Sequence, residues 1–108
     1  MVGVNDADMA VAANRLAEIG GGQVAVLNGR VLAELPCPVA GLLSELPFEE
    51  VAAGTMRLET AAHNDLGVTY PAPFMAMSFL ALSVIPELRI TDRGLVDVVN
   101  FEPVGLLA

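Results

Sequence analysis

Residues 24–34 read VAVLNGRVLAE, and this stretch decides the fold of the N-terminal part of the chain. Two short β-prone runs, residues 24–27 and 30–34, flank the dipeptide Asn28-Gly29. A type I′ turn needs positive φ at both of its central residues, and Asn-Gly supplies this conformation readily. We therefore predict an antiparallel hairpin over residues 24–34.

A first helix is predicted between residue 5 and the glycines at 20–22. Asn5 and Asp6 are residues that cap helices, because their side-chain oxygens accept the unpaired N–H groups of the first turn. Asp8 falls in that turn, where the helix dipole favours a negative charge. The predicted apolar face leaves Arg15 in solvent and consists of Met9, Ala13 and Leu16.

A second helix is predicted from Pro47, at its first turn, to Gly67, where it ends. Its apolar face consists of Val51, Leu58, Ala62 and Leu66. Residues 35–41, which contain Pro36 and Pro38, separate this helix from the hairpin. Proline fixes φ and removes a backbone donor, so neither a helix nor a central strand is expected there.

The C-terminal third has weaker signals. Residues 74–82 form an apolar run that fits either a short buried helix or a strand. Residues 91–94, TDRG, predict a turn, and the apolar residues between Val96 and Phe101 predict a last strand. Residues 2–4, VGV, are typical of the end of another strand. Together these elements predict an α+β fold, with a small, mostly antiparallel sheet packed with two main helices.

Composition narrows the possible functions. The chain has 108 residues, which suits a single domain, with five Arg, no Lys and 13 acidic residues, so its formal net charge is −8. This charge argues against binding to nucleic acid or to an anionic membrane surface, since both need a basic face. The hydrophobic fraction of 55% exceeds the approximately 45–50% of ordinary soluble domains, which favours an interface with another protein.

The sequence also argues against insertion into a membrane or secretion. The longest uncharged run, residues 71–86, is shorter than the approximately 20 residues that a membrane helix needs, and prolines interrupt it. The N-terminus lacks the basic and apolar regions of a signal peptide. A single cysteine fits a reducing compartment. We therefore expect a cytoplasmic protein.

Neither catalytic residues nor metal ligands are predicted in this chain. His63 is the only histidine, which excludes a site with several imidazole ligands, and we interpret it as a polar residue at the edge of a helix. Cys37 lies between two prolines without a cationic neighbour that would lower its pKa, so we expect a buried thiol. Nothing assembles a nucleophile, a base and an oxyanion hole.

Two groups of residues are candidates for contact with a substrate or with a protein surface. The first is the cluster Asn5, Asp6 and Asp8, for which helix capping is the alternative explanation. The second lies in the apolar run and consists of Met75, Ser78 and Phe79. Methionine is frequent at adaptable interfaces, but packing in a core is the alternative there.

A resemblance to a known family rests on five segments taken in order: 3–9 (GVNDADM), 20–22 (GGG), 35–44 (LPCPVAGLLS), 73–80 (PFMAMSFL) and 84–98 (VIPELRITDRGLVDV). In this order they resemble the C-terminal domain of bacterial adenine deaminases, and the resemblance covers nearly the whole chain. Two positions depart from the family pattern. Cys37 stands where the family usually has Leu, and Ser83 stands where it often has Pro.

The resemblance implies that the catalytic machinery lies elsewhere. The family belongs to the amidohydrolase superfamily, whose (β/α)₈ barrel binds Mn or Fe and, in this family, hydrolyses adenine to hypoxanthine and ammonia. Such a barrel uses several histidines, and this chain has one. No barrel residue can be carried over, so residues 1–108 are expected to be an accessory domain that has no cofactor of its own and is inactive alone.

The expected partner is the amidohydrolase barrel of the same protein. Packing on that barrel, shaping access to its substrate site and dimerisation are the expected roles, and a homo-oligomer is expected. The alternative is a free-standing module, derived from this domain, that dimerises or binds a small ligand.

Overall fold

The computed structural model describes residues 1–106. The chain divides into two compact units, Met1–Pro73 and Phe74–Ala108. We refer to them as unit 1 and unit 2 and describe each by itself.

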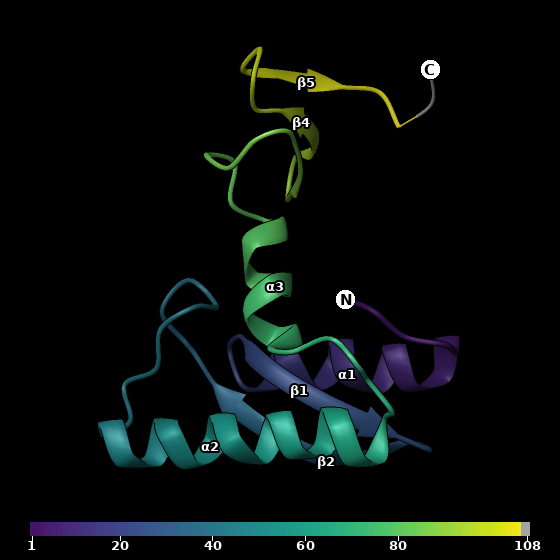
Figure 1. Ribbon diagram of the computed structural model, residues 1–108, viewed down its shortest axis with the longest axis vertical. Coiled ribbons are helices and arrows are strands. Elements are labelled where there is room, and N and C mark those ends of the chain that lie inside the picture. Colours follow the sequence, from purple (N-terminus) through teal and green to yellow (C-terminus); the bar gives the residue numbers. More distant parts are fainter. Residues whose placement is uncertain (107–108) are drawn as a thin grey trace. The chain divides into compact units, whose positions relative to one another are not determined.

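Unit 1 is a β-hairpin with a helix before it and a helix after it (Figure 1). Its elements are α1 (Asp6–Glu18), β1 (Gly22–Leu27), β2 (Arg30–Pro36) and α2 (Phe48–Thr60), and α2 continues into a π-helical turn, η1 (Ala61–Asp65). Gly67, with φ of 69°, ends this second helical segment. The helix boundaries therefore lie close to those predicted from capping residues and glycines.

The predicted type I′ hairpin is confirmed. Asn28 and Gly29 have φ of 51° and 74°, as both central residues of this turn require. β1 and β2 pair antiparallel, with a register shift between Ala25 and Val26. β2 runs two residues beyond the predicted end and closes at Pro36, which is tolerated because β2 is an edge strand.

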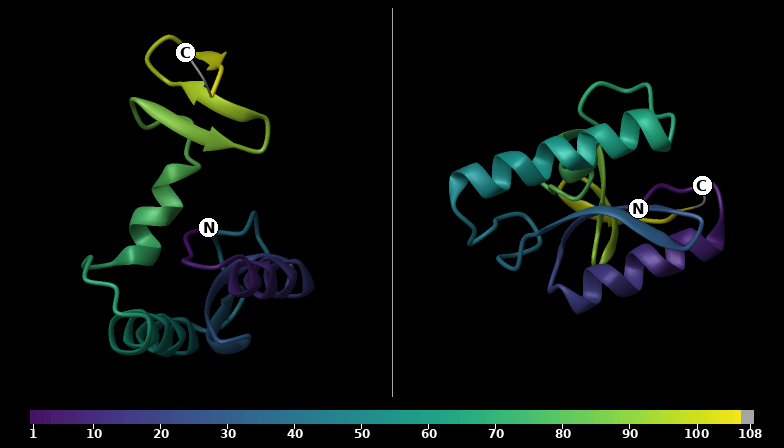
Figure 2. Two further views of the ribbon diagram at one scale, coloured as in Figure 1. Left: turned by 90° about the vertical axis from the view of Figure 1, so that its right-hand side faces the viewer. Right: turned by 90° about the horizontal axis from the view of Figure 1, so that it is seen from below.

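The two helices of unit 1 cover opposite faces of the hairpin. Leu35 of β2 lies against Gly54 of α2, where an added Cβ would be 2.9 Å from Leu35 Cδ1. The preceding residue, Glu34, instead bonds to Arg15 of α1. Successive side chains of a strand point to opposite faces, so α1 and α2 lie on either side of the hairpin, as the right-hand view of Figure 2 shows.

The core of unit 1 is small and made mostly of small side chains. Leu58 of α2 is fully buried, with 0% of its surface exposed. The other buried hydrophobic residues of unit 1 are Ala25, Ala33, Leu35, Cys37, Ala61 and Ala62. Two leucines, a cysteine and four alanines leave little redundancy, so the packing of unit 1 depends strongly on Leu58.

Unit 2 consists of one helix and a three-stranded antiparallel meander. Its elements are α3 (Pro73–Leu80), β3 (Leu88–Thr91), β4 (Gly94–Asp97) and β5 (Glu102–Val104). The apolar run at residues 74–82 is thus a helix rather than a strand, and the predicted turn at residues 91–94 joins β3 to β4. The α+β fold class is confirmed, although its strands form two small sheets rather than one.

Several local predictions were wrong. Residues 2–4 are exposed and belong to no strand. Ala13 is exposed on α1, whereas Ala12 is half-buried. The predicted last strand is divided by a turn, because the Asp97 carboxylate accepts hydrogen bonds from the backbone N–H groups of Val99 and Asn100. Such a side-chain bond to the backbone competes with continuation of a strand.

Candidate functional site

The acidic cluster at the start of α1 ties this helix to the hairpin turn. Asn5 caps the helix, since its side-chain oxygen accepts a hydrogen bond of 2.8 Å from the Asp8 N–H. The Asp8 carboxylate accepts bonds from the N–H groups of Asn28 at 3.0 Å and Gly29 at 2.6 Å. Capping by Asn5 is confirmed, and Asp8 has a structural partner that its position in the helix did not indicate. Contact of Asn5, Asp6 or Asp8 with a substrate stays a prediction.

The hydrogen bonds to Asp8 make the stability of unit 1 vary with pH in the acid range. The Gly29 N–H, followed by the Asn5 amide and the Asn28 N–H, holds the pKa of the Asp8 carboxyl below its ordinary value. A carboxyl whose pKa is lower in the folded state stabilises that state above its unfolded pKa, and this contribution is lost as the pH falls through the folded pKa.

The free energy of unfolding of the variant Asp8→Asn should therefore fall less steeply than that of the parent chain as the pH is lowered below about 5. Urea unfolding midpoints at several acid pH values measure this difference. Asp6→Asn is the matched control for the loss of one negative charge, because Asp6 is exposed in the same turn. Parallel profiles for the parent chain and Asp8→Asn would contradict the assigned role.

A bidentate ion pair links α1 to β2. Arg15 donates from Nε and Nη2 to the two carboxylate oxygens of Glu34, both at 2.7 Å, and from Nη1 to Glu18 at 3.0 Å. The bonds from Arg15 lower the pKa of Glu34, while Glu34 and then Glu18 raise the pKa of Arg15. The prediction that Arg15 is solvated was wrong, because its partner lies 19 residues away in sequence on the strand it faces.

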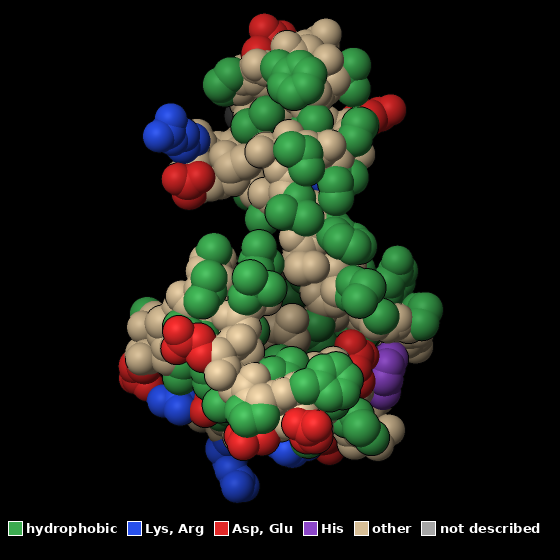
Figure 3. Space-filling view, turned by 90° about the vertical axis from the view of Figure 1, so that its left-hand side faces the viewer, with side chains coloured by type: hydrophobic (Ala, Val, Ile, Leu, Met, Phe, Trp, Pro, Cys, Tyr) green, Lys and Arg blue, Asp and Glu red, His purple; other side chains and the backbone are tan. Residues whose placement is uncertain are grey.

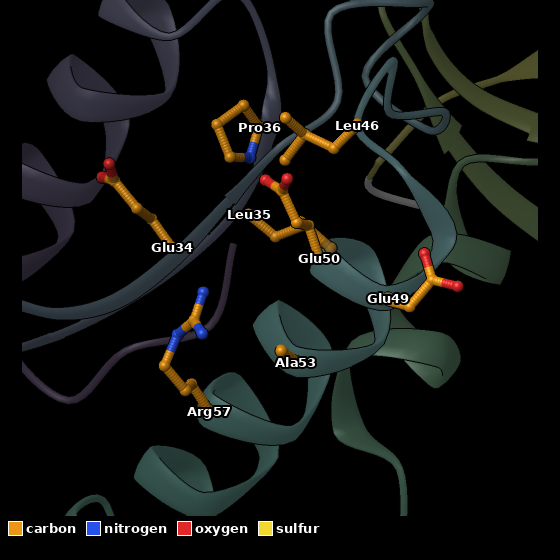
Figure 4. Close-up of a pocket in the computed structure, with 8 residues that line it drawn as sticks. All are labelled: Glu34, Leu35, Pro36, Leu46, Glu49, Glu50, Ala53 and Arg57. Atoms are coloured by element: carbon orange, nitrogen blue, oxygen red, sulfur yellow. The ribbon is translucent and has the colours of Figure 1, made fainter.

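A groove runs along β2 beside this ion pair. One hollow, of about 550 Å³, is lined by Arg15, Arg57 and residues 31–34. A second, of about 310 Å³, is lined by Glu34, Leu35, Pro36, Leu46, Glu49, Glu50, Ala53 and Arg57. In Figure 4, Glu34 points toward α1 and Arg57 reaches from α2 toward β2. Both hollows share Glu34 and Arg57, and we refer to the two together as the β2 groove.

The apolar candidates lie on α3 in unit 2. Met75 and Phe79 are 61% and 47% exposed, and the Ser78 hydroxyl donates to the Met75 carbonyl. None of the residues of α3 is buried, although Ser78 is half-buried. Hydrophobic side chains cover much of the face of unit 2 drawn in Figure 3. A role for Met75, Ser78 and Phe79 at a substrate or an interface stays a prediction.

The other reactive side chains have structural partners. His63 Nδ1 lies 2.7 Å from the Val68 carbonyl, and its Nε2 lies 3.5 Å from Glu59. Cys37 is buried, as predicted, and burial raises the pKa of its thiol. Within residues 1–106, no group of three or more His, Cys, Asp and Glu side chains is placed to hold a metal ion.

The sequence patterns did not identify Glu34 and Arg57 as candidate site residues, whereas the structure places both in the β2 groove. Each stands in an ordinary amphipathic segment, and their proximity arises from the packing of α2 on β2. Alternation along β2 was the one available signal, because Glu34 lies between the buried residues Ala33 and Leu35.

In the part of the chain that is described, no helix is long and apolar enough to cross a bilayer.

Comparisons with known proteins agree on one family. A family model described as "Adenine deaminase C-terminal domain" matches residues 1–102. The chain is 54% identical over 107 residues to an adenine deaminase of Moorella thermoacetica, covering 99% of this chain and 18% of the relative. Adenine deaminases of Brucella abortus and Cereibacter sphaeroides are 55% and 57% identical, over 97% and 94% of this chain. The chain thus spans about 18% of the length of these relatives.

Proposed function

The chain belongs to the adenine deaminase C-terminal domain family, and from this premise we propose that it serves a larger enzyme that hydrolyses adenine to hypoxanthine and ammonia. One observation carries the proposal. Relatives named adenine deaminase match 97–99% of this chain at 54–55% identity, but the match covers only 18% of their length. The chain corresponds to an accessory domain, and the remainder of such a protein is the candidate for the chemistry.

The residues of this chain do not fit the Mn or Fe that the resemblance implies. Its one histidine is engaged with Val68 and Glu59, and no candidate ligand set lies in residues 1–106. The described residues therefore offer no site for metal-dependent chemistry. We propose that an amidohydrolase barrel in the same cytoplasmic polypeptide binds both metal and adenine, and that this chain alone is inactive.

Exposed apolar surface supports a role in packing against that barrel. On β3, Leu88 and Ile90 are 50% and 64% exposed. Ile90 pairs with Leu95, which pairs with Val104, so an apolar row crosses the sheet of unit 2. Contiguous exposed apolar patches on a domain mark sites of interaction. We propose that this row and Met75, Ser78 and Phe79 of α3 contact the barrel near the approach to its substrate site.

A chimera tests the proposed function. In it, this chain replaces the homologous C-terminal region of the Moorella thermoacetica relative, which is 54% identical. We expect the chimera to release ammonia from adenine at a rate within about tenfold of the parent enzyme, since the interface is shared within the family. A form that lacks the C-terminal region should lose most of its activity or its thermal stability.

Two results would contradict the proposal. One is full activity and unchanged stability in the form that lacks the C-terminal region. The other is release of ammonia from adenine by the isolated 108-residue chain, with a mock purification as control. The alternative, a free-standing module that dimerises, predicts instead a chain that sediments as a stable dimer and has no effect in the chimera.

A further inference from the structure

The outer edge of β2 is an unpaired strand edge. β1 pairs with β2 on one side, and within residues 1–106 the sheet has no third strand. The backbone N–H and C=O groups along the outer side of β2 therefore have no strand to bond to. Such an edge is a template for pairing with another strand, and a two-stranded hairpin is only marginally stable by itself.

The β2 groove follows this free edge. The larger hollow is lined by Arg15 of α1, Arg57 of α2 and residues 31–34 of β2, without any residue of β1. The smaller hollow continues along Leu35 and Pro36. The groove thus extends beside β2 from Val31 to Pro36, and residues of both α1 and α2 line its larger hollow, whereas only α2 contributes to its smaller one.

A strand, unlike a helix, can continue the hydrogen-bonded sheet beside β2, at the usual spacing of about 4.8 Å between strands. Because α1 and α2 cover opposite faces of the hairpin, a strand added beside β2 would lie between them in the plane of the existing sheet. It would cover Val31 and Leu32, which are each 39% exposed.

The edge carries only some of the devices that prevent pairing. Natural proteins protect edge strands with lysines, prolines, bulges or short length. β2 has seven residues, the chain contains no lysine, and the proline of β2 is its last residue. The register shift at Ala25 and Val26 leaves Leu32 as a single bulged residue of β2. Arg30 and Glu34 are charged, but Glu34 is neutralised by Arg15. An edge left open in this way is consistent with a strand that pairs there in the complete protein.

Resting on the proposed function, we propose that the outer edge of β2 binds an added β-strand from the part of the deaminase polypeptide that lies outside this chain. That part is available in cis, since this chain spans only 18% of its relatives. Arg57 is exposed, and none of the ion pairs within residues 1–106 involves it. It would therefore donate to a carboxylate or carbonyl group of the incoming strand.

Hydrogen exchange tests this proposal in the chimera described above. Among residues 31–35, the amides whose N–H groups point away from β1 should exchange about tenfold or more slowly in the chimera than in the isolated chain, because an added strand bonds the free edge. The double variant Val31→Lys/Leu32→Lys should lose this extra protection. Met56→Lys is the matched control, since Met56 is 71% exposed on α2 and does not line the groove.

The outcomes separate this inference from the proposed function. An active chimera whose β2 amides exchange as fast as in the isolated chain would overturn the inference and leave the proposed function standing. A folded but inactive chimera with protected β2 amides would count against the proposed function alone. A dimer of the isolated chain that Val31→Lys/Leu32→Lys dissociates would show that a second copy occupies the edge, which also overturns the inference.

Circular dichroism of each variant checks that unit 1 is folded. If the double lysine variant is unfolded, Arg57→Glu replaces it, because Arg57 is exposed on the groove wall outside β2. That variant should reduce the extra protection of β2 in the chimera while leaving the isolated chain unchanged. Full protection in Arg57→Glu would contradict the role of Arg57 as a donor to the added strand.

Discussion

Replacing Leu58 by alanine should lower the free energy of unfolding of unit 1 by about 3 kcal/mol or more. Leu58 is fully buried, so the substitution removes buried methyl groups and leaves a cavity that the surroundings fill only in part. Four of the other buried residues of unit 1 are alanines, Ala25, Ala33, Ala61 and Ala62, and alanine has no side-chain rotamers with which to close the space. The free energy of unfolding of a domain is only about 5–15 kcal/mol, so this loss would remove a large share of the stability.

Urea unfolding followed by far-ultraviolet circular dichroism measures this change. The matched control is Met56→Ala, two residues earlier on α2, where the side chain is 71% exposed. Leucine and methionine have similar helix propensities, so the two substitutions differ mainly in burial. The control should change stability by no more than about 0.5 kcal/mol. Equal effects at the two positions would show that Leu58 is not the centre of the core.

Local signals in the sequence predicted the hairpin and the ends of the helices correctly. Asn28-Gly29 specifies its own turn, because few other residue pairs adopt two successive positive φ values. Asn5 caps α1 through a bond to an N–H three residues away. These features depend on neighbouring residues only, which is why they could be predicted from the sequence.

Features that depend on distant residues were missed. On α1, the half-buried side includes the charged residues Asp8 and Arg15, which find their partners on the hairpin turn and on Glu34. Periodicity of apolar residues cannot locate such a face, since it assigns every charge to solvent. The β2 groove was missed for the same reason, because its walls come from two helices that meet only through the hairpin.

β1 and β2 approach each other closely at the open end of the hairpin. Gly22 is therefore the glycine of unit 1 at which we expect an added side chain to be most destabilising. Its φ is +137°, and an added Cβ would collide with the Leu35 carbonyl oxygen and lie 2.9 Å from the Cys37 nitrogen. Both are backbone atoms, so no side-chain rotation relieves the contact. Gly22 also pairs with Pro36, which closes the ladder between β1 and β2. An alanine there must separate the strands or shift the loop at Cys37.

Gly22→Ala should therefore destabilise unit 1 by about 3 kcal/mol, since backbone strain of about 1–3 kcal/mol and overpacking add together. The control is Gly41→Ala, which also has a positive φ, of +74°, but nothing within 4 Å of the added Cβ. It should cost only about 1 kcal/mol, from the left-handed conformation alone. The difference between the two urea midpoints isolates the collision from the strain. In the chimera, Gly22→Ala should also speed exchange at β2, because the strand that forms the groove loses its closed end. Equal stability of the two variants would mean that β1 and β2 are further apart at this end than the structure shows.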